Sequence, residues 1–133
     1  MNAQLKKGVL ELIVLESVCK RDMYGYELVE EVSKVIDVNE GTIYPLLKRL
    51  TNEKYFETYL RESTEGPSRK YYHITAAGIL YRNELELEWT QLADRVWLFL
   101  NSDKRNTAAD QDASNKILTI GIGNHRAKER IDG

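Results

Sequence analysis

The spacing of apolar side chains changes twice along this chain of 133 residues, and that change constrains the fold more than any other feature. Up to about residue 54, apolar residues recur every three or four positions, which is typical of amphipathic helices. Residues 55–60 and 70–74 are rich in aromatic and β-branched side chains with a period of two, which indicates strands. The helical spacing returns at residue 76 and lasts to about residue 100. The sequence therefore predicts three helices, a β-hairpin and a long final helix.

Three helices are expected before the hairpin, over residues 5–18, 24–35 and 40–54. Asn39 is the expected N-cap of the third, since its side-chain oxygen can accept a free N–H of the first turn. Pro45 removes a backbone donor inside this helix, so we expect a bend there and not a break. The expected broad apolar face of the first helix is Leu5, Val9, Leu12 and Ile13, flanked by Leu10, Leu15 and Val18, and that of the third helix is Ile43, Leu46, Leu47 and Leu50.

The expected hairpin has a long polar tip, because residues 61–69 separate the two strand-like runs and contain Gly66 and Pro67. Thr75 is expected to cap the final helix, over residues 76–100. The apolar side chains of this helix step by four and three positions, like the seam of a coiled coil. These seam residues are Leu85, Trp89, Leu92, Val96 and Phe99.

Composition excludes several classes of protein. The single Cys19 allows no intramolecular disulfide, and with only two histidines, His73 and His125, a structural zinc site lacks ligands. Glu11 and Glu16 interrupt the apolar N-terminal stretch, which argues against a signal peptide or a membrane span. No catalytic pair, metal cluster or phosphate loop is evident, so we expect no enzyme and no cofactor. A soluble cytoplasmic protein without membrane contact is expected.

The expected organisation is a first domain over residues 1–75, the long helix over 76–100 and a tail over 101–133. The tail is dominated by polar residues, and we expect it to be mostly disordered. Its one apolar cluster, Ile117–Ile122, is either a short sticky segment or a docked strand or partner motif.

Charge is unevenly distributed, although the net charge is only −2. Residues 41–75 hold six basic and four acidic side chains, whereas the flanking helices are acidic. This basic window coincides with the third helix and the hairpin. Three helices followed by a hairpin and a helix form the order of a winged helix-turn-helix, mainly α with a small β-hairpin (α+β), in which the third helix enters the DNA major groove. Cations on these two elements can bind phosphates.

Four blocks of residues resemble the successive signatures of PadR-type transcriptional regulators. They are Tyr24-Gly-Tyr-Glu-Leu28, Gly41-Thr-Ile-Tyr-Pro-Leu-Leu-Lys-Arg-Leu50, Gly66-Pro-Ser-Arg-Lys-Tyr-Tyr72, and Ile74-Thr75 with Gly78. The resemblance runs over residues 5–100, and the single C-terminal helix is similar to the small subfamily. It implies a homodimeric DNA-binding repressor, whose last helix contacts its twin. One departure is Lys54-Tyr-Phe-Glu57, where the family usually has a Gly-Leu-Ile type of turn.

The resemblance also places the Tyr-Pro pair of the third helix on the DNA-facing surface, which makes Tyr44 the preferred contact to a phosphate or base. The full set of candidate DNA-binding residues is Asn39, Thr42, Tyr44, Lys48, Arg49, Arg69 and Lys70. The alternatives are that Tyr44 is a half-buried core aromatic and that Lys48, Arg69 and Lys70 are merely solvated. The resemblance implies that Trp89 lines a pore in the dimer where a flat aromatic ligand can stack; the alternative is that it only packs the dimer interface.

The sequence thus predicts a sequence-specific DNA-binding regulator, which we take to be a homodimeric repressor of a pseudo-palindromic operator, released by a small hydrophobic or aromatic effector. The other hypothesis is a winged-helix protein-interaction module that does not bind DNA, in line with the slightly negative net charge.

Overall fold

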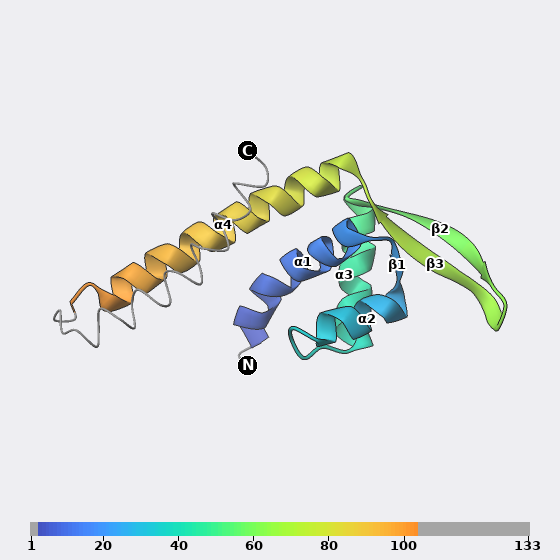
Figure 1. Ribbon diagram of the computed structural model, residues 1–133, viewed down its shortest axis with the longest axis horizontal. Helices are drawn as coiled ribbons and strands as arrows, with labels where there is room; N and C mark the ends of the chain where they lie inside the picture. The colour runs from blue at the N-terminus through green and yellow to red at the C-terminus, as the bar shows by residue number, and fades with distance from the viewer. Residues whose placement is uncertain (1–2, 104–133) are drawn as a thin grey trace. The chain divides into compact units, whose positions relative to one another are not determined.

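The structure is a computed structural model that describes residues 3–103, and it has the predicted order of helices with a small antiparallel sheet whose hairpin projects away from the first three helices (Figure 1). Contacts divide the chain into a compact unit up to Leu85 and a second unit from Glu86 onward. The predicted tail and its apolar cluster Ile117–Ile122 lie outside the described residues, apart from its first three positions. The elements are α1 Ala3–Lys20, β1 Met23–Tyr24, α2 Gly25–Ser33, α3 Glu40–Asn52, β2 Phe56–Ser63, β3 Gly66–Ile74 and α4 Ala76–Asn101.

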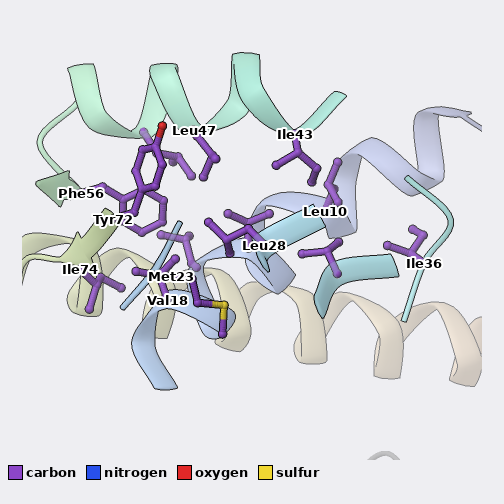
Figure 2. Close-up of a cluster of buried hydrophobic side chains, with 14 residues drawn as sticks. Leu10, Val18, Met23, Leu28, Ile36, Ile43, Leu47, Phe56, Tyr72 and Ile74 are labelled. Atoms are coloured by element: carbon purple, nitrogen blue, oxygen red, sulfur yellow. The ribbon is translucent and has the colours of Figure 1, made fainter. Parts of the chain in front are cut away.

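One apolar cluster holds the three helices and the inner face of the sheet together (Figure 2). The third helix contributes the side chains that its pattern predicts: Ile43, Leu47 and Leu50 are fully buried, and Leu46 packs against them. The sheet contributes the buried residues Phe56, Tyr72 and Ile74. Burying each such side chain stabilises the fold by roughly 1.5–3 kcal/mol.

Only part of the broad apolar face predicted for α1 is buried. Leu5 is 63% exposed, and the residues that face the core are Leu10, Val14, Leu15 and Val18. Because α1 is apolar on most of its circumference, the sequence pattern did not single out one face. The packing of α2 and the sheet against it made that choice.

The second helix is shorter than predicted at both ends. Tyr24 lies outside the helix and forms β1 with Met23, and this strand pairs antiparallel with Tyr72 and Tyr71 of β3. At the other end Val35 is 69% exposed, and Ile36, beyond the helix, is buried in its place. A two-residue strand carries no periodicity, so the sequence could not reveal it.

The third helix begins as predicted. The side-chain oxygen of Asn39 accepts a hydrogen bond from the backbone N–H of Thr42 at 3.2 Å, which satisfies one free donor of the first turn. Pro45 lies inside α3, and the helix continues through it without a break to Asn52.

The helix ends in a turn that places a lysine where glycine is favoured. The N–H of Tyr55 donates to the carbonyl of Leu50 at 3.0 Å, and that of Lys54 donates to the carbonyl of Thr51 at 3.0 Å. This pair of bonds defines a Schellman motif, in which the C′ residue adopts the left-handed conformation. Lys54 is that residue, with φ of 70°. The departure of Lys54-Tyr-Phe-Glu57 from the family's glycine turn therefore falls on the one residue that a glycine would suit best.

The wing is longer and its turn tighter than predicted. Strands β2 and β3 reach Ser63 and Gly66, so the predicted nine-residue tip at 61–69 is wrong. Pairing persists through Arg61 opposite Arg69, with an irregularity before Ser63 opposite Gly66. With β1 the sheet has three strands in the order β1-β3-β2, one more than the predicted hairpin. The prediction treated residues 61–69 as a loop because they are polar. Both faces of the outer wing are exposed, so its strands do not show the alternation of apolar and polar residues that marks a half-buried strand.

The last helix starts at the predicted cap and packs on the first unit over its first ten residues. The hydroxyl oxygen of Thr75 accepts a hydrogen bond from the N–H of Gly78 at 3.0 Å, and the Thr75 hydroxyl donates to the carbonyl of Lys54 at 2.8 Å. Gly78 is buried, and a Cβ on it would clash with the carbonyl of Tyr55. Tyr81 donates to Glu11 at 2.9 Å. Among residues 3–103, no helix is both long and apolar enough to cross a bilayer.

Replacing Lys54 by glycine should stabilise the protein by about 1 kcal/mol, because glycine adopts positive φ without the steric cost that a Cβ brings. The measurement is the urea midpoint of the purified variant. Asn52→Gly is the matched control: Asn52 is the last residue of the helix, and glycine there should destabilise by up to about 0.5 kcal/mol. A Lys54→Gly variant that is no more stable than the wild type would contradict the inference that Lys54 is strained at this turn.

Candidate nucleic-acid interface

The outer surface of α3 is fixed by the burial of its inner face. Because Ile43, Leu47 and Leu50 point into the core, Thr42, Tyr44 and Lys48 lie on the accessible side of the helix. Among the described residues, Lys48 has no hydrogen-bond or ion-pair partner, so its charge is available to a ligand. Asn39 and Thr42 are exposed, and their side chains lie 3.4 Å apart. Asn39 is therefore already engaged as the N-cap.

Tyr44 is 41% exposed, so it is neither a buried core residue nor a fully solvated one. One edge of its ring lies against Gly25 at the start of α2. Burial, and then the negative charge of Glu40, raises the pKa of Tyr44 above its usual value of 10. Its hydroxyl is protonated at neutral pH and can donate a hydrogen bond to a phosphate oxygen.

Arg49 stands apart from the other candidates, because two carboxylates already compensate its charge. Its guanidinium lies 3.0 Å from Glu11 of α1 and 3.2 Å from Glu53, the residue that caps the end of α3. Burial opposes the charged form, but the hydrogen bonds and charges of Glu11 and then Glu53 outweigh it and raise the pKa of Arg49. Burial, together with the hydrogen bond to Glu11, also raises the pKa of Tyr81 to about 12. Arg49 therefore links α3 to α1, and its positive charge is less available to a phosphate than that of Lys48.

The structure brings the predicted residues of the wing together with Tyr44. One shallow depression of about 340 Å³ lies where α3, the start of α2 and β3 meet. It is lined by Tyr24, Gly25, Tyr26, Tyr44, Arg69, Lys70 and Tyr72. Asn39, Thr42, Lys48 and Arg49 are not part of its lining. Three of the predicted DNA-binding residues therefore share one concave surface, although Tyr44 lies 25 positions before Arg69 in the sequence.

Tyrosines that the sequence analysis did not select organise the cations of the wing. The rings of Tyr24, Tyr71 and Tyr59 form a row across the three strands, with centroids 5.5 and 5.6 Å apart. The guanidinium of Arg69 lies 4.6 Å from the ring centre of Tyr24, and that of Arg61 lies 4.3 Å from that of Tyr71. Alternate residues of a strand share a face, so the spacing of Tyr59, Arg61, Arg69 and Tyr71 was a signal that could have found this arrangement.

A second unpredicted cluster fixes the chain just before β1 to the outer face of the sheet. The hydroxyl of Tyr59 donates to Asp22 at 2.6 Å, and Nδ1 of His73 lies 2.8 Å from the same carboxylate. Burial opposes ionisation, but hydrogen bonds from Tyr59 and then His73, with the charges of His73 and Arg61, lower the pKa of Asp22. The Asp22 contacts hold the start of β1, and hence Tyr24, in place.

The seam residues of α4 are of two kinds. Leu85 is partly buried and packs against the core of its own chain. The other four are exposed: Trp89 by 47%, Leu92 by 61%, Val96 by 47% and Phe99 by 78%. They give the second unit an apolar stripe that none of the described residues covers.

Comparison with known proteins identifies the family. The model of the transcriptional regulator PadR-like family matches residues 14–84, more than half of the chain. The chain belongs to this family. It is 41% identical to a PadR-like transcriptional regulator from Bacillus cereus, over 74% of this chain and 97% of that one, with a TM-score of 0.67. It is 30% identical to a PadR family regulator from Eggerthella lenta, over 75% and 88% of the two chains, with a TM-score of 0.69.

A further relative is an uncharacterized protein from Lysinibacillus sphaericus, 32% identical over 104 residues, which are 75% of this chain and 95% of that protein. The PadR-like structures confirm the predicted winged-helix fold. The chain is a DNA-binding transcriptional regulator of the PadR-like family, and the surface formed by α3 and the wing is its candidate nucleic-acid interface.

Proposed function

We propose that the protein is a homodimeric repressor that binds a pseudo-palindromic operator through α3 and the wing and is released by a small hydrophobic or aromatic effector. The observation that carries the DNA-binding part is the shared depression in which Tyr44 of α3 meets Arg69 and Lys70 of β3. The Tyr44 hydroxyl and the charged groups of β3 are donors that a phosphate oxygen can accept from. Binding to chromosomal DNA would place the protein in the cytoplasm.

The charge distribution supports this proposal despite the net charge of −2. Glu11 and Glu53 pair with Arg49, so these carboxylates do not oppose DNA at the exposed surface. Lys48 on α3 and the cations of the wing remain accessible. Two copies in a dimer double the number of phosphate contacts, and contacts of this kind dominate the affinity of proteins for DNA.

Operator binding tests this reading. In electrophoretic shift on the protein's own promoter region at two salt concentrations, Lys48→Ala should weaken binding and lower the slope of log affinity against log salt by about 2, because a dimer loses two phosphate contacts. Tyr44→Ala should weaken binding with little change in that slope, since the phenol is neutral.

The matched control for Lys48→Ala is Lys34→Ala, which removes an exposed lysine just beyond α2 that does not line the depression. This variant should bind like the wild type. A Lys48→Ala variant with wild-type affinity and wild-type salt dependence would count against α3 as the helix that contacts DNA. Absence of any wild-type binding at low salt would favour the protein-interaction module instead.

The exposed stripe of α4 supports the dimer. Trp89, Leu92, Val96 and Phe99 recur at intervals of three and four, as in a two-helix seam, and large apolar side chains exposed by about half or more are unfavourable in water. A dimer would also set the two α3 helices to reach successive major grooves, about 34–36 Å apart.

Leu92→Glu should convert the dimer to a monomer, because it places a charge at the centre of the seam, where the partner helix would desolvate it. Sedimentation should show a halved mass, and operator affinity should fall by at least about a hundredfold as half-sites are no longer bound together. Gln91→Glu adds the same charge at the adjacent exposed position and should remain dimeric. A dimeric Leu92→Glu variant would contradict the α4 interface.

Trp89 is the proposed effector contact, since an exposed indole in the dimer seam offers a flat apolar face for stacking. Planar hydrophobic compounds should quench tryptophan fluorescence and release the operator, and Trp89→Ala should lose most of both responses. Trp97→Phe, which removes the other tryptophan, is the control and should keep both. Native fluorescence that is indifferent to every such compound would argue against effector sensing at this helix.

A further inference from the structure

The junction between β1 and α2 lies between the two elements of the nucleic-acid interface. Tyr24 ends β1, pairs with Tyr71 of β3, and its N–H donates to the carboxylate of Glu27 at 3.2 Å. The next residue, Gly25, is the first of α2 and is buried. This junction is therefore held to the wing on one side and to the helix on the other.

Gly25 decides where the ring of Tyr44 can lie. A Cβ built on Gly25 would clash with Cε1 of that ring and lie 3.0 Å from its hydroxyl oxygen. The backbone of Gly25 does not have a positive φ, so its conformation alone does not call for glycine. What requires glycine is the close approach of the Tyr44 ring. Any larger residue would push the phenol out of the depression.

Tyr24 contacts a cation of the wing. Its ring lies 4.6 Å from the guanidinium of Arg69, within the range of a cation–π contact. Its other neighbour is the ring of Tyr71, at 5.5 Å. Arg69 has many rotamers when free in solvent, and a ring on one side limits them, so that less entropy is lost when the guanidinium binds a ligand.

We propose that Tyr24 and Gly25 are positioning residues that assemble one phosphodiester-binding site from two elements, the Tyr44 hydroxyl of α3 and the Arg69 guanidinium of the wing. The inference deepens the proposed function and rests on it. Both groups are hydrogen-bond donors, and Lys70 also lines the depression. A backbone phosphate has the anionic acceptor oxygens that such a set binds. The site couples α3 to the wing, so the two elements engage the backbone together.

A double-mutant cycle tests the role of Gly25. Gly25→Ala should lower operator affinity about tenfold, as expected for the loss of a hydrogen bond to a charged group. Its melting temperature should stay the same or rise, because alanine restricts the unfolded chain and the Tyr44 ring can swing outward. In a Tyr44→Ala background the same substitution should have no effect on affinity. An equal loss in both backgrounds would overturn the positioning role.

A second cycle tests Tyr24 on the outer face of the sheet. Tyr24→Phe keeps the ring and should retain affinity, whereas Tyr24→Leu removes it and should weaken binding several-fold. In an Arg69→Ala background the two variants should bind alike. A Tyr24→Leu variant that binds like the wild type, or an undiminished difference between Phe and Leu without Arg69, would overturn this half of the proposal.

Neutral methylphosphonate links placed one at a time in the operator identify the phosphate. The wild type should lose affinity at one position in each half-site, and Tyr44→Ala and Arg69→Ala should each be less sensitive than the wild type at that same position. Sensitivity of the two variants at different positions would mean two separate contacts and would overturn the shared site. A wild type that binds no DNA would overturn the proposed function as well, whereas normal binding with additive cycles would overturn the inference alone.

Discussion

The burial of one face of α3 is the constraint on which the interface depends. Ile43, Leu47 and Leu50 are fully enclosed by α1, α2 and the inner face of the sheet. With 3.6 residues per turn, fixing these three positions fixes the direction of the rest of the helix. Tyr44 and Lys48 face outward for that reason and not because of their own chemistry. Core packing therefore decides which side of α3 forms the proposed DNA-binding surface.

The ends of α3 are held as firmly as its middle. Asn39 caps the start, and the Schellman turn at Lys54 leads directly into β2. Thr75 then donates its hydroxyl to the carbonyl of Lys54, so the start of α4 closes on the same turn. These bonds set the angle between the helix and the wing. That angle decides whether Tyr44 and Arg69 share a depression. The hydrogen bonds of the turn at Lys54 therefore affect the geometry of the proposed nucleic-acid interface.

Charge shows why a sum over the chain says little about binding. The net charge of −2 is unfavourable for DNA, yet the structure pairs Arg49 with Glu11 and Glu53 and leaves Lys48 accessible. Adjacent cations on one helix thus differ in what they can do: one braces α3 against α1, and the other is available to phosphate. Sequence places both in the same basic window and cannot separate them, because the partner Glu11 lies 38 positions away.

The sequence by itself determined the order of elements, the caps at Asn39 and Thr75, and the buried face of α3, because periodicity and capping are local properties. It also indicated the family through short motifs. Tertiary structure decided the rest: which side of α1 is buried, that Met23 and Tyr24 form a third strand, and that the wing is paired almost to its tip. It alone brought Tyr24, Gly25, Tyr44 and Arg69 together. Contacts between residues far apart in sequence depend on how the elements pack, and no local pattern records that.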